Sequence, residues 1–281
     1  MTSHDDIFRL AGVMGWPIGH SRSPLIHNHW LQAHGLRGTY VPLAVPPERL
    51  ERALRALRPL GFAGVNLTVP LKTSALRIVD RLDEAAAAIG AVNTVVVEED
   101  GQLEGRNTDA FGFVASLREA KPDLDLTRGP AVVLGAGGAA RAVAWGLKEA
   151  GAPRIRVLNR TLHRAEVLAA ELGAEAHPWE EREAVLADAA LVAQTTSLGM
   201  QGHDLLPLRL DALPGDALVC DIVYAPRRTA LLEAARERGN PVVEGLGMLL
   251  HQARPAFAAW FGVLPDVDPA LRALLDVSLP G

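Results

Sequence analysis

A single lysine closes a polar, strand-like motif in a chain that is otherwise almost free of lysine. Lys72 ends the run Gly64–Lys72 (GVNLTVPLK), and the 281 residues contain two other lysines, Lys121 and Lys148, so 25 of the 28 basic residues are arginines. An amine can change its protonation state, whereas a guanidinium stays charged. The pattern indicates that Lys72 is an acid/base group; the alternative is a surface lysine extended over apolar neighbours.

The proline two residues before this lysine predicts its local structure. Pro70 suits the first turn of a helix. Lys72 would then lie near a helix N-terminus, where the macrodipole disfavours a cation. We therefore expect this position to favour the neutral amine.

A glycine-rich turn stands between an apolar run and a helical segment. In Val132–Ala140, Gly135 and Gly137 occupy the tight-turn and pyrophosphate-approach positions, and Ala140 occupies the close-packing position. The backbone amides from Gly137 onward would hold a pyrophosphate. The segment predicts a dinucleotide-binding turn.

The end of the next predicted strand indicates which dinucleotide. An NAD-selective site has an acidic residue there for the ribose 2′-hydroxyl, and Asn159–Thr161 has none. Arg160 and Arg164 instead offer planar donors to a 2′-phosphate. The sequence favours NADP, although Arg164 alone could be helix surface.

Two serines near the N-terminus have two interpretations. Ser23 before Pro24 is typical of a helix cap. Ser21 and Ser23 together, beside free helix amides, could instead bind a carboxylate. The histidines around them, His20 and His29 as well as His27, lack a metal-ligand pattern, and we expect His27 to be a packing residue with satisfied polar atoms.

Composition narrows the class of protein. The net charge of -5 and the absence of a basic stripe argue against nucleic-acid binding and favour a small-molecule partner. Cys220, in an apolar run, is expected to be a buried, inert thiol in a reducing cytoplasm. Asp5 and Asp6 precede any apolar run and no stretch of about 18 apolar residues exists, so we expect neither a signal peptide nor a membrane span.

Apolar runs alternate with amphipathic segments, which is typical of an α/β fold with largely parallel sheets. Before residue 109 we expect strands at about 10–14, 39–45, 63–68 and 91–97, helices starting at Pro24, Pro46 and Pro70, and a hairpin turn at 99–101. Beyond it we expect strands at 131–134, 155–158, 189–193 and 217–220, and helices at 110–120, 137–151, 161–172, 248–261 and 269–275.

Taken together, the motifs resemble those of the shikimate dehydrogenase family over nearly the whole chain. The matching segments are 15–24, 64–72, 89–94, 107–109, 135–138, 159–161, 221–224 and 245–253. The resemblance implies two α/β domains with the active site in the cleft between them: a substrate domain (1–108 plus 246–281) and a Rossmann-type, doubly wound NADP-binding domain (109–245). One departure is Gln194, where the family usually has Asn, so no role is inferred for it.

The resemblance also implies site residues and a reaction, the reversible NADPH-dependent reduction of 3-dehydroshikimate to shikimate. The catalytic pair would be Lys72 and Asp109. Shikimate would be bound by Ser21, Ser23, Thr68, Asn93, Asp109, Tyr224 and Gln252, and NADP by Gly135, Ala136, Gly137, Gly138, Ala139, Asn159, Arg160, Thr161, Arg164, Ile222 and Gly245. No metal is expected, and the protein would be a monomer or homodimer.

Three questions stay open at this level. Lys72 could carry the proton or act as an electrostatic clamp, because burial and a neighbouring carboxylate have opposite effects on an amine. The alternative enzyme is a quinate/shikimate dehydrogenase of the same family. The alternative outside enzymes is a non-catalytic NADP-binding regulatory protein, against which the presence of both Lys72 and Asp109 argues.

Overall fold

The structure, a computed structural model, describes residues 8–278. The contacts within the chain divide it into two compact units. The first comprises residues 8–108 together with Gln252–Ser278, and the second comprises Asp109–His251. Asp5 and Asp6, on which the expectation about a signal peptide depends, lie outside the described residues.

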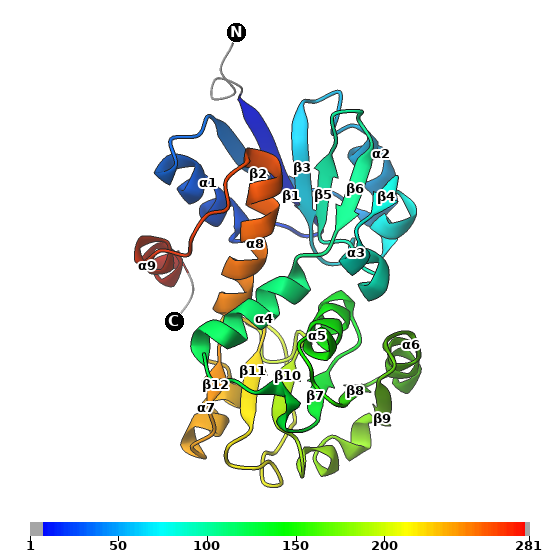
Figure 1. Ribbon diagram of the computed structural model, residues 1–281, viewed down its shortest axis with the longest axis vertical. Helices are drawn as coiled ribbons and strands as arrows, with labels where there is room; N and C mark the ends of the chain where they lie inside the picture. Colours follow the sequence, from blue (N-terminus) through cyan, green and yellow to red (C-terminus); the bar gives the residue numbers. More distant parts are fainter. Residues whose placement is uncertain (1–7, 279–281) are drawn as a thin grey trace. The chain divides into compact units, whose positions relative to one another are not determined.

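The first unit is built on a six-stranded mixed sheet (Figure 1). The strand order is β2-β1-β3-β5-β6-β4, and β5 runs antiparallel to both of its neighbours while the other pairs are parallel. The strands are β1 (Arg9–Gly15), β2 (Gly38–Ala44), β3 (Phe62–Leu67), β4 (Arg81–Leu82), β5 (Thr94–Val97) and β6 (Leu103–Arg106). The expected hairpin at 99–101 is confirmed between β5 and β6.

Helices pack against this sheet on both faces. They are α1 (Ser23–Ala33), α2 (Leu50–Arg55), α3 (Glu84–Ile89) and the part of α8 (Gly245–Phe261) from Gln252, while α9 (Pro269–Ser278) packs on α1. Alternating residues of β3 separate the two faces, because successive strand side chains point in opposite directions. Val65 and Leu67 pack with Leu50 and Leu54 of α2, whereas Asn66 points to the other face.

That other face carries a group of rings that we call the aromatic cluster: His27, Trp30, Tyr40, Phe257 and Trp260. They come from α1, β2 and α8. All five side chains are at most 1% exposed. The cluster therefore fixes α1 and α8 on the sheet.

The helix expected at Pro70 is absent. The Val69–Pro70 peptide is cis, and the Leu71 N–H donates to the Thr68 carbonyl at 2.8 Å, so residues 68–71 form a reverse turn. Regular structure resumes only in the short 3₁₀ helix Ser74–Arg77. Proline favours turns as well as helix starts, and here the turn prevails. The helix-dipole argument for Lys72 is therefore wrong.

The second unit is built on an all-parallel six-stranded sheet. Its order, β9-β8-β7-β10-β11-β12, is that of a doubly wound dinucleotide-binding fold, in which the chain reverses direction across the sheet between β7 and β10. The strands are β7 (Ala131–Leu134), β8 (Ile155–Asn159), β9 (Glu175–Pro178), β10 (Leu191–Gln194), β11 (Leu218–Asp221) and β12 (Val242–Val243). The expected doubly wound fold is confirmed.

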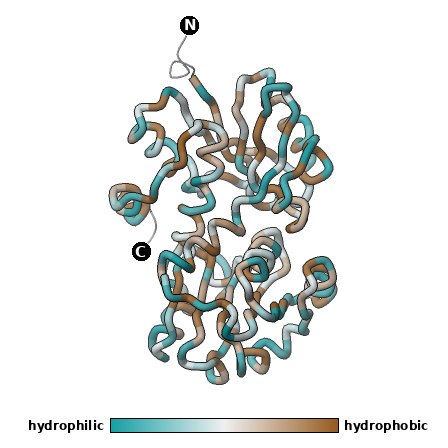
Figure 2. Tube along the Cα trace, viewed as in Figure 1, coloured by the Kyte–Doolittle hydropathy of each residue, from teal (hydrophilic) through white to brown (hydrophobic). Residues whose placement is uncertain are grey.

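Both faces of this sheet are covered, as a parallel sheet requires. One core contains Val133 and Val157 with residues of α4 (Asp109–Ala120), α5 (Gly138–Glu149) and α6 (Leu162–Leu172). The opposite core contains Val132 and Leu158 with residues of α7 (Ala230–Glu237). Figure 2 shows apolar stretches along these strands. No described helix combines the length and apolar character needed to cross a membrane.

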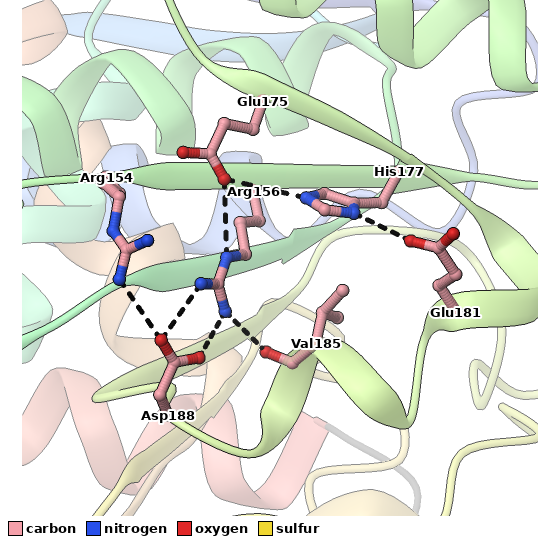
Figure 3. A network of polar contacts seen from close by, with 7 residues as sticks. All are labelled: Arg154, Arg156, Glu175, His177, Glu181, Val185 and Asp188. Atoms are coloured by element: carbon pink, nitrogen blue, oxygen red, sulfur yellow. Dashed lines mark hydrogen bonds and ion pairs between the residues drawn. The ribbon is translucent and has the colours of Figure 1, made fainter.

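The edge of this sheet at β8 and β9 is held by charged side chains (Figure 3). Arg156, on β8, is 9% exposed and donates to both oxygens of Asp188 and to the Val185 carbonyl. His177, on β9, contacts Glu181 at 2.9 Å. These contacts fix β8, the strand whose end carries Asn159.

Candidate active site

A network of hydrogen-bonded, buried polar side chains lies in the first unit. We call Tyr40, Asn66, Asn93, Thr94 and Thr108 the buried polar network. The Tyr40 hydroxyl donates to Asn66 Oδ1 at 2.6 Å, and Asn66 Nδ2 donates to the Asn93 carbonyl at 3.2 Å and to Thr94 Oγ1 at 3.0 Å. The position of Asn93, a predicted site residue, thus depends on hydrogen bonds to neighbours that the sequence analysis did not select as site residues.

The Asn93 side chain is held in one orientation. Its Oδ1 accepts from the Thr108 N–H at 2.8 Å and from Thr94 Oγ1 at 3.0 Å, and its Nδ2 donates to Thr108 Oγ1 at 2.9 Å. Nδ2 also lies 3.4 Å from Gln252 Oε1. Because the backbone N–H can only donate, the network assigns oxygen and nitrogen of this amide. Asn93 and Gln252, two predicted substrate residues, are therefore brought together.

The two serines also lie together, and the cap interpretation of Ser23 is wrong. Helix α1 begins at Ser23, its N-cap residue is Arg22, and no side chain caps it. The Ser23 N–H donates to Ser21 Oγ at 3.3 Å. Ser23 therefore lies inside the first turn of α1 and does not cap it.

Thr68 and Lys72 lie on the turn that follows β3. The Thr68 N–H donates to the Met14 carbonyl at 3.0 Å. The Lys72 carbonyl accepts from the Val92 N–H at 2.9 Å, so the lysine backbone is tied to the residue before Asn93. Both side chains are partly exposed. The first unit thus gathers Thr68, Lys72 and Asn93 at one end of neighbouring strands.

The glycine that opens the lysine motif is required by packing. Trp260 Nε1 donates to the Val95 carbonyl at 3.1 Å directly over Gly64. A Cβ on Gly64 would collide with both the Trp260 ring and the Val95 carbonyl. The absence of a side chain here lets α8 approach β3.

His27 packs as expected, but its polar atoms are not satisfied. Its ring stacks on Tyr40 with centroids 4.1 Å apart and planes 3° apart. Neither ring nitrogen has a hydrogen-bond partner among the described residues. Burial lowers the pKa of His27 from 6.5 to about 3. The aromatic surroundings stabilise the ring through stacking and leave no acceptor for its N–H.

In the second unit, the glycine-rich turn has the geometry that a pyrophosphate needs. Gly135 has φ +118°, and a Cβ there would lie 2.6 Å from Thr195 Oγ1. Gly137 is the N-cap of α5 and has nothing within 4 Å of a Cβ position, so its outer side is open. Ala140 is fully buried against the sheet. The first amides of α5 are thereby accessible to an anion.

The end of β8 carries the residues predicted to select the dinucleotide. Asn159 Nδ2 donates to the Thr161 carbonyl at 2.9 Å, and Thr161 is the N-cap of α6. Arg160 and Arg164 are exposed, and neither forms an ion pair within the described chain. No carboxylate residue occupies 159–164. Two guanidinium groups therefore stand at the strand end.

The remaining predicted residues of this unit follow β11 or begin helices. Asp109 is the first residue of α4 and is 4% exposed. Ile222 donates its N–H to the Gln194 carbonyl at 3.1 Å, and a Cβ on Gly245, at the start of α8, would collide with the Ile222 carbonyl. Tyr224 follows on the same loop and is partly exposed.

A buried carboxyl group supports that loop, and a buried thiol precedes it in the sequence. Asp221 accepts from the Val223 N–H at 3.0 Å and from Thr229 Oγ1 at 2.7 Å. Burial nevertheless raises the pKa of the Asp221 carboxyl to about 6, because these bonds offset only part of the desolvation. Burial likewise raises the pKa of the Cys220 thiol. The expectation of a buried, inert cysteine is confirmed.

Gln194 has a structural role that the sequence analysis left open. It is fully buried at the end of β10. Its Nε2 donates to Thr196 Oγ1 and to the Leu198 carbonyl, both at 2.9 Å, and its Oε1 accepts from the Thr196 N–H at 3.0 Å. The longer amide thus holds residues 195–198 against the strand end beside Gly135.

These features define a class of protein. A doubly wound sheet with an open glycine turn and arginines at the end of β8 characterises a protein that uses an NADP-type dinucleotide. A lysine beside a buried polar network, in a separate unit, adds the groups that proton transfer to a hydroxylated small molecule requires. The chain therefore has the architecture of an NADP-dependent oxidoreductase.

Comparisons with known proteins identify the family. Three profiles match in order: the shikimate dehydrogenase substrate binding domain at residues 13–95, shikimate/quinate 5-dehydrogenase at residues 118–200, and the shikimate 5′-dehydrogenase C-terminal domain at residues 245–275. A shikimate dehydrogenase (NADP⁺) of Paramagnetospirillum magneticum is 56% identical over 269 residues, which cover 95% of this chain and 98% of that protein. The chain belongs to the shikimate dehydrogenase family.

Solved structures agree with this assignment. Shikimate 5-dehydrogenase of Thermus thermophilus, in complex with NADP(H) and shikimate, has a TM-score of 0.86 and 40% identity, covering 96% of this chain and 100% of that one. Quinate dehydrogenase of Corynebacterium glutamicum, in complex with NAD, has a TM-score of 0.88 and 34% identity with the same coverage. The fold is thus shared by enzymes solved with different cofactors. The choice between NADP and NAD therefore has to be tested at the residues that end β8.

Proposed function

We propose that this protein is an NADP-dependent shikimate dehydrogenase, which reduces 3-dehydroshikimate reversibly to shikimate in the synthesis of chorismate and the aromatic amino acids. The observation that carries the proposal is the pairing of two features in one chain. The end of β8 offers Arg160 and Arg164 without a carboxylate. In the first unit the Lys72 carbonyl is bonded to the N–H of Val92, which precedes the fixed Asn93 amide.

The residues of the second unit fit an NADP molecule. The open side of Gly137 admits a pyrophosphate to the amides of α5, and the exposed guanidinium groups of Arg160 and Arg164 suit a 2′-phosphate. The holding residues in this proposal are Gly135, Ala136, Gly137, Gly138, Ala139, Asn159, Arg160, Thr161, Arg164, Ile222 and Gly245. An NAD-selective site would need an acidic residue at the end of β8.

The proposed substrate residues divide by chemistry. Ser21 and Ser23 offer hydroxyl donors beside the start of α1, which suits a carboxylate. Thr68, Asn93, Asp109, Tyr224 and Gln252 offer the mixed donors and acceptors that ring hydroxyls require. Buried amides of fixed orientation discriminate strongly between ligands. A ligand that cannot pair with them binds more weakly, because the amides are then left buried without a hydrogen-bond partner.

Proton transfer falls to the proposed catalytic pair. When bound, NADPH supplies a hydride to the carbonyl carbon of the substrate. Lys72, as the ammonium, donates a proton to the carbonyl oxygen, and the Asp109 carboxylate accepts a hydrogen bond from the hydroxyl that this step forms. Asp109 is the first residue of α4, at the positive end of the helix macrodipole.

We further propose that the protein works in the cytoplasm. Cys220 is the one cysteine of the chain and is buried. A reducing compartment suits such a chain, because no disulfide can form within it.

The proposed function is tested by initial rates on the purified protein. Shikimate and quinate are each supplied with NADP⁺ or NAD⁺, and reduced nicotinamide is followed by absorbance. The proposal expects the highest kcat/KM for shikimate with NADP⁺. Faster turnover of quinate with NAD⁺ would support the alternative enzyme of the family, and no turnover with any pair would support the non-catalytic alternative.

A further inference from the structure

Gln194 ends β10 at the place where a doubly wound sheet binds its ligand. It is paired with Leu134, the last residue of β7, on one side and with Asp221, the last residue of β11, on the other. The chain reverses direction between β7 and β10, and such folds bind ligands beyond the carboxyl ends of the strands at this reversal. Gln194 therefore stands between the strand ends that carry Gly135 and Ile222.

Both the side chain and the backbone of Gln194 hold neighbouring loops. Its Nε2 donates to Thr196 Oγ1 and to the Leu198 carbonyl, and its Oε1 accepts from the Thr196 N–H. A backbone N–H can only donate and a carbonyl can only accept, so these bonds assign the oxygen and nitrogen of the amide. The Gln194 carbonyl accepts from the Ile222 N–H at 3.1 Å. One buried residue thus fixes two loops at the carboxyl edge of the sheet.

The hydroxyl of Thr196 is left with one hydrogen to donate. Its Oγ1 accepts from Gln194 Nε2 at 2.9 Å and from the Leu198 N–H at 3.1 Å. A hydroxyl has two acceptor lone pairs and one hydrogen, so both lone pairs are occupied. No described residue accepts the remaining hydrogen, and Thr196 is partly exposed. The two bonds therefore orient a donor that is available to a ligand.

This donor lies beside the glycine-rich turn. Thr196 Cγ2 is 3.1 Å from the position that a Cβ on Gly135 would take, and Thr195 Oγ1 is 2.6 Å from it. The Thr195 hydroxyl and N–H both donate to the Leu134 carbonyl, at 2.6 and 3.0 Å. Residues 195 and 196 are thus packed directly on the first glycine of the turn that suits a pyrophosphate.

We propose that Gln194 is a positioning residue for dinucleotide binding. By occupying one lone pair of Thr196 Oγ1 and bonding the Thr196 N–H, it directs the free hydroxyl hydrogen to an oxygen of the dinucleotide that lies on the glycine turn. The pyrophosphate and the sugars beside it are common to NADP and NAD, so Gln194 supports the binding of both. The inference deepens the proposed function and rests on it for the class of ligand.

Replacing the amide of Gln194 should weaken both dinucleotides equally. Gln194→Met keeps the length and the burial of the side chain and removes its three hydrogen bonds. The freed groups belong to partly exposed residues, so water can pair with them. Titration of NADPH and NADH fluorescence should give Kd values that both rise roughly five- to tenfold, the effect of one lost hydrogen bond. KM for shikimate should stay within about twofold of wild type. The pattern differs from that of the Arg160 and Arg164 variant, which should weaken NADP alone.

A buried amide elsewhere in the same unit provides the matched control. Asn240 is 4% exposed, and its Nδ2 donates to the carbonyls of Pro214 at 2.8 Å and Ala217 at 3.0 Å. It precedes β12, at the opposite edge of the sheet from Gln194. Asn240→Leu should lose stability in urea comparably to Gln194→Met and leave both Kd values unchanged. Equal weakening of the dinucleotides by the two variants would overturn the proposal.

Substitutions of Thr196 test whether Gln194 acts through its hydroxyl. Thr196→Val should weaken NADPH and NADH by about the same factor as Gln194→Met, whereas Thr196→Ser, which keeps the hydroxyl, should bind them as wild type does. The double variant Gln194→Met, Thr196→Val should bind no more weakly than Gln194→Met, because the two groups act as a unit. Effects that multiply independently, or a wild-type Kd in Gln194→Met, would overturn the proposal.

A measurement on the wild type keeps the test valid if Gln194→Met does not fold. In protein labelled with ¹⁵N-threonine, the backbone resonance that Thr196→Ser removes is that of Thr196. It should shift on addition of either NADP⁺ or NAD⁺, and a resonance that stays in place at saturation with both would overturn the proposal. These measurements follow binding without turnover. A wild type that binds NADP⁺ but does not oxidise shikimate would contradict the proposed function alone, which the rate assay detects separately.

Discussion

Replacing His27 by phenylalanine should make the protein more resistant to acid unfolding. The His27 ring is fully buried, stacks on Tyr40, and has no hydrogen-bond partner for either nitrogen within the described chain. Phenylalanine keeps a flat ring in the stack and removes two unsatisfied polar atoms. It also removes a group that takes up a proton near pH 6.5 in the unfolded chain but only near pH 3 in the folded protein.

The sign and size of the effect follow from the pKa of His27. Burial lowers it from 6.5 to about 3. Above pH 6.5 the ring is neutral in both states and contributes no pH dependence. Below that pH the unfolded chain binds a proton that the folded chain does not, so stability falls by about 1.4 kcal/mol per pH unit. At pH 5 the wild type has lost about 2 kcal/mol that His27→Phe should keep.

Urea unfolding at pH 7.5 and pH 5, followed by tryptophan fluorescence, measures this difference. Trp30 and Trp260 lie against His27, with ring centroids 5.7 and 5.6 Å away. The variant should gain about 2 kcal/mol over wild type on going from pH 7.5 to pH 5. His203→Gln, which removes an exposed histidine, is the control and should show no such gain. An equal loss of stability with acid in wild type and His27→Phe would refute the reasoning.

Three other substitutions test separate parts of the account. The pKa of the buried Asp221 carboxyl is raised from 3.8 to about 6, so the wild type should lose about 3 kcal/mol of stability as the pH rises from about 4 to above 6. Asp221→Asn should abolish this loss, which urea unfolding at pH 4 and pH 8 measures. Gly64→Ala should lower the unfolding free energy by more than about 2 kcal/mol, since the new Cβ meets Trp260 and a carbonyl, and near-normal stability in urea would contradict that packing. Removing Arg160 and Arg164 together should raise KM for NADP⁺ at least about tenfold and barely change KM for NAD⁺, and equal losses would withdraw the 2′-phosphate assignment.

Much of the second unit could be predicted from the sequence because its signals are local. Each expected strand coincides with a continuous apolar run, and the glycine turn directly joins β7 to α5. The strands β4 and β12 were not predicted, since each has two residues and no run to detect. Strand β9 was also missed, because its side chains are only partly buried or exposed.

The errors in the first unit arise where one residue serves two kinds of structure. Pro70 could begin a helix or complete a turn, and the hydrogen bond from Leu71 to Thr68 decides for the turn. Ser23 could cap α1 or lie within it, and the folded backbone makes Arg22 the N-cap and Ser23 the first helical residue. The choice in each case depends on partners that are set by the folded backbone.

The buried polar network had almost no signal in the sequence. Asn66 stands within the lysine motif and could have been selected there, but Tyr40 is 26 residues away from it in the chain. Only the pairing of β2 with β1, and of β1 with β3, brings the two residues to one face of the sheet. Such long-range contacts cannot be derived from local patterns.

The most direct test of the central claim is the effect of Lys72→Ala on turnover and on cofactor binding in the same preparation. Initial rates give kcat with saturating shikimate and NADP⁺, and titration of NADPH fluorescence gives its Kd. We predict a kcat roughly 10²- to 10⁴-fold below wild type, the usual size of a lost acid/base group, with an unchanged Kd. A variant that turns over shikimate at a near-normal rate would contradict the assignment of Lys72 and, with it, the proposed mechanism.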